Sequence, residues 1–109
     1  MEYKAAQVHV GGGVDLWQVN WKDIQEGDDI PFWDKIGMMA TVEVTGDANG
    51  VTILGQIAGD EFFPLNDSDT LALNFVYPGI KSCNDMFRKI KPKKSGPGIA
   101  TVSMLIRRN

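Results

Sequence analysis

The sequence predicts a single all-β domain, and three observations support this prediction. Apolar and polar residues alternate in short runs, which is the pattern of half-buried strands. The chain has 12 glycines and 5 prolines, and many of them separate these runs and indicate turns. No long stretch shows the 3.6-residue period of an amphipathic helix. With 109 residues, the chain has the size of one domain, and about seven strands in this length indicate a sandwich or a small barrel.

The first clear strand covers residues 16–21. Its alternation places Trp17, Val19 and Trp21 on one face, an unusually large aromatic load for one strand. The polar residues 22–31 then predict a loop that leads to the next aromatic residues.

The N-terminal residues fit the strand pattern less well. The run Gly11-Gly12-Gly13 has no side chains to pack and a high backbone entropy. We therefore expect residues 1–14 to form either an extended arm that orders on a partner or an edge segment with a strand at residues 7–10. Residues 15–109 would then form the folded domain.

The most specific turn signal is Asn49-Gly50, because both residues tolerate a positive φ. It predicts a tight hairpin between a strand at residues 38–45 and a strand at residues 51–57. The residues of the first strand that we expect to point inward are Met38, Ala40, Val42 and Val44.

The remaining elements follow from shorter patterns. Pro64 limits residues 61–65 to a short or edge strand. Further strands are expected at residues 70–75 and 86–92, and residues 77–84 predict a connector with one helical turn. In the last strand, residues 99–106, the residues expected to point inward are Ala100, Val102, Met104 and Ile106.

The formal charge of −3 hides an uneven distribution. Fourteen acidic residues and four lysines precede Met86, and seven basic residues without an acidic one follow it. We expect basic strands to pair with acidic strands inside the fold, and the alternative is a charged contact surface for a partner protein. The lysine-rich residues 89–94 lack interleaved aromatic residues, and the overall balance is acidic, so nucleic acid is not an expected partner.

The residue types that usually carry catalysis or bind metals are scarce. The chain has one cysteine, Cys83, and one histidine, His9, so it can form no intrachain disulfide and has few components for a catalytic triad or a metal cluster. The carboxylate pairs Asp28-Asp29 and Asp60-Glu61 lie beside glycine turns, where solvated acids are common. The spacing in Asp67-Ser68-Asp69 lacks the glycine and distal glutamate of a calcium loop. We therefore expect no enzyme activity, no cofactor and no bound metal.

The sequence also gives no sign of a membrane or secreted protein. No apolar run approaches the roughly 20 residues of a membrane-spanning helix. Residues 1–10 lack the hydrophobic region of a signal peptide. We expect a protein that is made and used without secretion and without membrane contact.

An aromatic group, Trp17, Trp21, Phe32 and Trp33, is the most informative cluster. One or two of these residues can fill the core. Phe32 and Trp33, which follow Pro31 in a loop, can instead anchor an interface. A stacking platform for sugars is the third possibility.

In their order and spacing, the strand and turn segments resemble the small capsid decoration proteins, or cement proteins, of tailed bacteriophages. The similarity covers the chain from about Trp17 onward, and its individual motifs are short strand and turn phrases. The residues 55–60 depart from the turn that is common in this family. The segments that carry the resemblance are Gly27-Asp28-Asp29-Ile30-Pro31, Ala40-Thr41-Val42-Glu43-Val44-Thr45-Gly46, Gly50-Val51-Thr52-Ile53-Leu54-Gly55, Phe63-Pro64-Leu65-Asn66-Asp67, Pro78-Gly79-Ile80-Lys81, Phe87-Arg88-Lys89-Ile90-Lys91-Pro92 and Ala100-Thr101-Val102-Ser103-Met104-Leu105-Ile106-Arg107-Arg108.

The resemblance implies a jelly-roll β-sandwich of about seven or eight strands that lies on the outer surface of a virion. Such a protein is made in the host cytoplasm, binds the major capsid protein and bridges its subunits, often as a homodimer. Both the N-terminal segment and the aromatic group are candidates for the contact. The residues that we expect to bind the partner are Tyr3, Val8, His9, Val10, Trp17, Trp21, Phe32 and Trp33.

Two other functions remain open from the sequence. A carbohydrate-binding β-sandwich would use the tryptophans as stacking surfaces. The second is a tail or adaptor component of a phage. Composition does not distinguish it from a shell protein, and only its position in the particle would.

Overall fold

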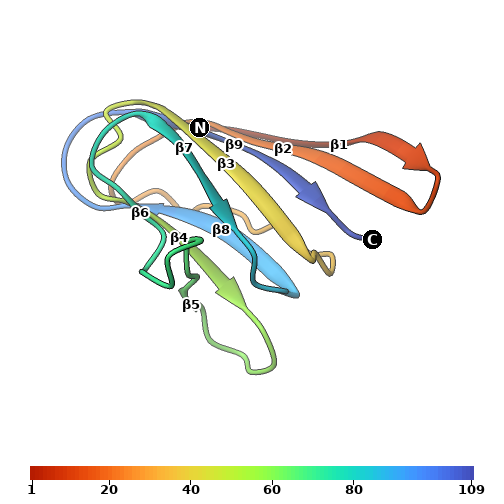
Figure 1. The fold of residues 1–109 in the computed structure, drawn as a ribbon. Coiled ribbons are helices and arrows are strands. Elements are labelled where there is room, and N and C mark those ends of the chain that lie inside the picture. Colours follow the sequence, from red (N-terminus) through yellow and green to blue (C-terminus); the bar gives the residue numbers. More distant parts are fainter.

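Nine strands form two antiparallel sheets in the computed structural model, which describes all 109 residues (Figure 1). The structure contains no helix, so the prediction of an all-β fold is confirmed. The strands number one or two more than expected. They are β1 (Glu2–Gly11), β2 (Val14–Ile24), β3 (Met39–Gly46), β4 (Val51–Gln56), β5 (Phe63–Pro64), β6 (Asn74–Phe75), β7 (Gly79–Cys83), β8 (Lys89–Lys94) and β9 (Ala100–Arg107).

The first sheet has the order β1-β2-β9-β3-β7, and the second sheet is built around β4. Strand β8 pairs with the whole length of β4, so the short strands β5 and β6 share the other edge of β4. On the far side of β8, Trp33 pairs with Ile90 and Gly37 pairs with Phe87 as isolated bridges. The segment before β3 therefore extends the second sheet beyond β8.

One hydrophobic core joins the two sheets. It contains 21 buried residues, drawn from the inward faces of both sheets and from the loops between them. The alternation predicted for β3 and β9 is confirmed for their buried residues, whereas Met38 precedes β3 and is exposed. The largest fully buried side chains are those of Trp21, Trp33 and Phe87.

The predicted hairpin between β3 and β4 is wrong, because these strands belong to different sheets. Their connection crosses from one sheet to the other beside the connection between β8 and β9. Asp47 N donates to the Ile99 oxygen (2.9 Å), and Ser95 N donates to the Gly50 oxygen (2.8 Å). Gly50 has a φ of +81°, and a Cβ there would collide with the Ser95 carbonyl group. Asn49-Gly50 thus allows the two connections to pass close to each other and does not form the turn of a hairpin.

A buried lysine lies inside this pair of crossings. Lys94 is only 3% exposed. Its ammonium group donates to the Asn49 oxygen (2.7 Å) and to the Pro97 oxygen (3.0 Å), one carbonyl from each connection. Lys94 therefore holds the two connections together.

Two other segments were open or differ from their predictions. Of the two alternatives for the N-terminal segment, the structure shows the edge strand and not the unpaired arm: residues 2–11 form β1, which is longer than expected, pairs with β2 and has an irregularity between Gln7 and His9. Residues 79–83 form strand β7 beside β3, where the sequence predicted a helical turn. The two pairings involve residues distant in sequence or separated by glycines, so a local pattern did not reveal them.

The expected pairing of basic strands with acidic strands is wrong for β8 and has one example at the end of β9, where Arg108 meets Asp15 of β2. The lysine-rich β8 pairs with β4, and β4 has no acidic residue. The two ion pairs of the structure join Lys4 to Glu2 (3.0 Å) and Arg108 to Asp15 (3.4 Å). The ammonium groups of β8 therefore lie at the surface, donate to carbonyl oxygens or contact aromatic rings.

The molecule is elongated, with principal extents of 42 × 25 × 25 Å. The hairpin of β1 and β2 extends beyond the second sheet at the right of Figure 1. The structure contains no helix that could span a membrane.

Candidate functional site

The structure places two of the expected contact residues in the core. Trp21 is fully buried, and its indole Nε1 donates to the Pro31 oxygen (2.8 Å). Trp33 is also buried, and its backbone is paired with Ile90. These two side chains do not reach the surface, so the expectation that they bind a partner is wrong.

Trp17 is partly buried at the edge of the core. Its ring lies 6.1 Å from that of Trp33, and the Lys35 ammonium lies 4.9 Å from its centroid. Its indole Nε1 is buried without a hydrogen-bond partner. Trp17 therefore offers little free aromatic surface.

Tyr3 is also packed rather than free. Its ring lies 5.4 Å from that of Trp21, and burial raises the pKa of its phenol. Of the four residues proposed from the N-terminal segment, the three exposed ones are Val8, His9 and Val10.

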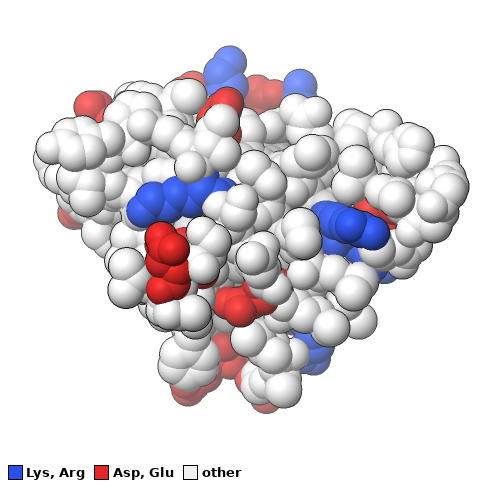
Figure 2. Space-filling view, viewed as in Figure 1, with Lys and Arg blue, Asp and Glu red and all other residues white.

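These three residues lie near the end of the β1–β2 hairpin. Val8 is 50% exposed and Val10 is 70% exposed. No residue between Ala5 and Val14 carries a formal charge, and Figure 2 shows the corresponding end of the molecule without charged side chains on the visible face. The hairpin end is thus an uncharged projection with two exposed valines.

The outer edge of β1 is unpaired, because β1 is the end strand of its sheet. Almost all of its ten side chains are exposed, so β1 adds little to the core. Its NH and CO groups on the open edge can pair with another strand. Two features hinder the pairing of this edge with another chain. They are the charges of Glu2 and Lys4 and the irregularity after Gln7.

A second surface lies on the outer side of β8 and was predicted only in part, through the exposed Phe32 and the alternative of a charged contact surface. Lys89, Lys91 and Lys93 alternate with buried residues and therefore point outward. The Lys89 ammonium lies 4.6 Å from the centroid of Phe32, and that of Lys91 lies 4.6 Å from the centroid of Phe62. The two rings lie 5.8 Å apart. We call these three lysines and two phenylalanines the Lys–Phe face.

A hollow of about 310 Å³ adjoins this face. Lys91 and Lys93 line one part of it, with Leu54 and Phe62 as apolar neighbours. Asp28 and Asp29 line another part. The hollow therefore offers charges of both signs together with apolar contact. Its full lining is Asp28, Asp29, Ile30, Leu54, Phe62, Lys91, Pro92 and Lys93.

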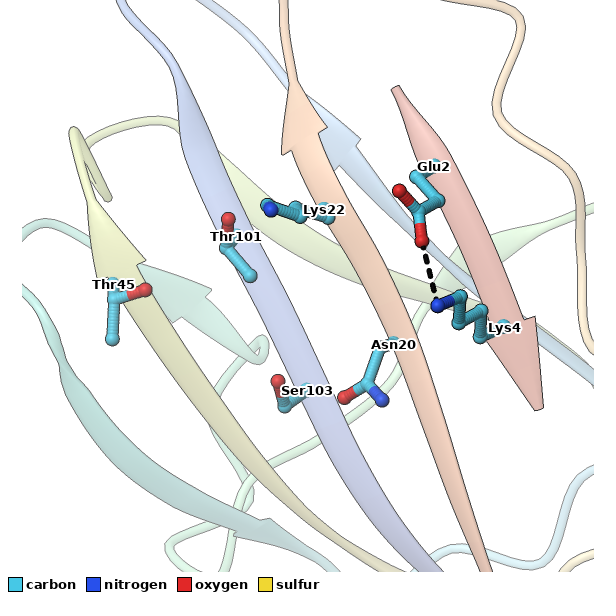
Figure 3. A pocket seen from close by; sticks show the side chains of 7 residues that line it. All are labelled: Glu2, Lys4, Asn20, Lys22, Thr45, Thr101 and Ser103. Carbon is cyan, nitrogen blue, oxygen red and sulfur yellow. Dashed lines mark ion pairs between the residues drawn. The ribbon is translucent and has the colours of Figure 1, made fainter. Parts of the chain in front are cut away.

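A third surface is a polar hollow of about 370 Å³ on the outer face of the first sheet (Figure 3). Glu2 and Lys4 form their ion pair on one side of it, and this contact holds the pKa of Glu2 below its ordinary value. Asn20 and Ser103 are neighbours across β2 and β9. No aromatic residue lines the hollow, which therefore offers hydrogen bonds without a stacking surface. Its lining residues are Glu2, Lys4, Asn20, Lys22, Thr45, Thr101 and Ser103.

The loop between β6 and β7 exposes a further aromatic residue. Tyr77 is 79% exposed and lies between Val76, which is also exposed, and Pro78. Tyrosine is enriched at the energetic centres of interfaces. Tyr77 was not among the expected contact residues, because these were chosen around the tryptophans. Its position before a proline in the segment Val-Tyr-Pro was the signal that could have indicated an exposed turn.

The cysteine and the aspartates that were considered as catalytic or metal-binding residues have structural roles. Cys83 is buried, and this burial raises the pKa of its thiol. A carboxylate oxygen of Asp67 accepts from the NH groups of Asp69 and Leu71, and Asp28 accepts from that of Gln25. These carboxylates stabilise turns, as their positions beside turn residues suggested.

Comparisons of this chain with protein families, with curated proteins and with solved structures find no match.

Proposed function

We propose that this chain is a non-enzymatic structural protein that binds the outside of a phage capsid and bridges neighbouring subunits of the major capsid protein. The nature of the partner comes from the resemblance to capsid decoration proteins. The observation that supports a binding role is β1, a ten-residue strand with one open edge and side chains outside the core. A strand of a partner can add to such an edge through main-chain hydrogen bonds.

The hairpin end supplies apolar contact for the same partner. Val8 and Val10 are exposed in the isolated chain, and no charge surrounds them in the sequence. Complete burial of an aliphatic side chain such as valine contributes about 1.5–3 kcal/mol. Two valines together with an added strand are sufficient for a weak single contact.

Several weak contacts would act together on a capsid. A clamp that binds the assembled shell and not its free subunits stabilises the shell by mass action. A homodimer would double the number of contacts and raise the avidity.

The strand order supports the jelly-roll architecture that belongs to this proposal. A jelly roll combines two Greek keys in two sheets. The order β2-β9-β3-β7 in one sheet accompanies the order Trp33 segment-β8-β4-β6 in the other. This strand order and the core shared by the two sheets support a jelly-roll sandwich with β1 added at one edge.

The test is co-sedimentation of the purified protein with expanded empty phage shells and with unexpanded shells. We expect saturable binding to expanded shells. Replacement of both hairpin valines, Val8→Lys with Val10→Lys, would remove about 2–3 kcal/mol of contact and weaken Kd roughly 30- to 150-fold.

The matched control is Leu71→Lys, which also replaces an exposed apolar residue but lies in a turn far along the chain. Its binding should equal that of the unchanged protein. The proposal fails if neither type of shell binds the protein, or if the hairpin variant and the control bind equally well.

Two alternatives have separate tests. A carbohydrate-binding role would rely on exposed tryptophans, and the burial of Trp21 and Trp33 leaves it without that support. Quenching of tryptophan fluorescence by a glycan panel would favour it. A tail or adaptor role would be favoured if an antibody against this protein labelled the tail of virions rather than the shell.

A further inference from the structure

The Lys–Phe face carries positive charge that the fold does not neutralise. Lys89, Lys91 and Lys93 form no ion pair, since the two ion pairs of the structure lie elsewhere. Alternate residues of a strand are about 6.6–6.8 Å apart, so the three ammonium groups form a row along β8. Such a row complements a strand with acidic residues at alternate positions.

The row is also held in place. Lys89 and Lys91 lie over the rings of Phe32 and Phe62, and these rings contact each other. Contact with an aromatic face restricts a lysine side chain and leaves part of its ammonium group available. A ligand that binds these lysines therefore loses less side-chain entropy than it would with free lysines.

The composition of the face favours a protein segment over a nucleic acid. Single-stranded nucleic acids bind by stacking bases on aromatic faces, and here lysines cover one face of each phenylalanine. Asp28 and Asp29 line the adjoining hollow, and a nucleic acid has no cationic group that could pair with them. A protein segment can offer carboxylates to the lysines and a basic residue to these aspartates.

We propose that the outer face of β8 binds an extended acidic segment of a partner protein. Its alternate carboxylates contact Lys89, Lys91 and Lys93, and a basic residue of the segment contacts Asp28 and Asp29. Apolar side chains of the segment lie in the hollow beside Leu54 and Phe62. The inference rests on the proposed function for the kind of partner, which is a protein.

The test uses a synthetic peptide of alternating glutamate and valine with one terminal lysine, titrated into the isotope-labelled protein and followed by NMR. We expect chemical-shift changes along β8 and around Phe62. The double charge reversal Lys91→Glu with Lys93→Glu should weaken the peptide affinity at least tenfold, because two attractions become repulsions. Higher salt should weaken binding by the unchanged protein.

The matched control is Lys22→Glu, which changes a lysine on the other sheet and should leave the peptide affinity unchanged. The inference is overturned if the peptide shifts residues elsewhere, or if Lys22→Glu weakens binding as much as the double variant. Tighter binding of a ten-nucleotide oligothymidine than of the peptide would overturn it in favour of a nucleic acid.

This test is independent of the shell experiment. Peptide binding on β8 without binding to shells would keep the acidic-segment inference and discard the capsid role. Shell binding that Lys91→Glu with Lys93→Glu leaves intact, together with a peptide that does not bind, would keep the capsid role and discard the inference.

Discussion

Replacement of Lys94 by methionine is expected to destabilise the fold strongly. The Lys94 ammonium donates to two carbonyl oxygens, those of Asn49 and Pro97, at 2.7 and 3.0 Å. Hydrogen bonds from a charged group contribute about 1.5–3 kcal/mol each, and the buried ammonium offsets part of this through its lost hydration. Methionine has a similar length and leaves both carbonyl groups without this donor, so we expect a net loss of about 2–4 kcal/mol in the free energy of unfolding.

Urea unfolding followed by tryptophan fluorescence measures this loss. With a slope of about 2 kcal/mol per molar urea, the midpoint should fall by about 1–2 M. The control is Lys93→Met, the exposed neighbour on the same strand, whose change should stay within about 0.5 kcal/mol. If Lys94→Met and Lys93→Met unfold at the same urea concentration, the two carbonyl contacts do not stabilise the crossing and the reasoning is refuted.

Three further changes test the packing. Gly37→Ala would place a Cβ against the Phe87 ring and should cost about 1–3 kcal/mol in thermal or urea unfolding, and an unchanged midpoint would contradict this contact. Trp21→Phe removes the donor to the Pro31 oxygen and leaves a cavity, so its unfolding free energy should fall by about 2–4 kcal/mol; a loss below 1 kcal/mol would argue against the buried indole. Burial raises the pKa of the Cys83 thiol above its ordinary value of 9.0, so its contribution is complete below pH 9 and is lost as pH rises through the folded-state pKa. Unfolding titrations should show this loss, Cys83→Ala should abolish it, and an identical pH profile for both proteins would exclude the thiol as its source.

Local alternation was enough to predict the strands that line the core. In β3 and β9 the side chains switch faces at every residue, so the apolar set of each strand can be read without knowing its neighbours. The same local rule placed Val19 and Trp21 together on β2, and both are buried. It failed at Met38, which precedes β3 and lies outside the regular pairing.

The pairing of strands required information that the local pattern lacks. Asn49-Gly50 indicates a sharp change of direction, but it does not say whether the next strand returns to the same sheet. In the structure β3 pairs with β9 and β4 pairs with β8, and both partners lie about 40 to 60 residues later in the chain. These longer pairings determine that the turn is a crossing.

The contact surfaces were predicted in part. The apolar residues Val8 and Val10 are exposed, as a partner-binding segment requires. The number of tryptophans suggested that they bind a partner. Trp21 is buried instead, and its burial depends on how the two sheets pack. Of the Lys–Phe face, Phe32 was an expected contact residue, whereas Phe62 was not, because it is distant in sequence from the lysine that lies over it.

The location of β1 separates binding from folding. The core is built from β2, β9 and β3 against β4 and β8, whereas nearly every side chain of β1 is exposed. A substitution at Val8 or Val10 therefore changes the hairpin surface with little effect on the core, while a substitution at Trp21 acts on the core itself. If the partner binds the open edge of β1, it also covers main-chain groups that only water satisfies in the free chain. Binding would then protect the amides of β1 from hydrogen exchange far more than those of β3, which already has a partner on each side.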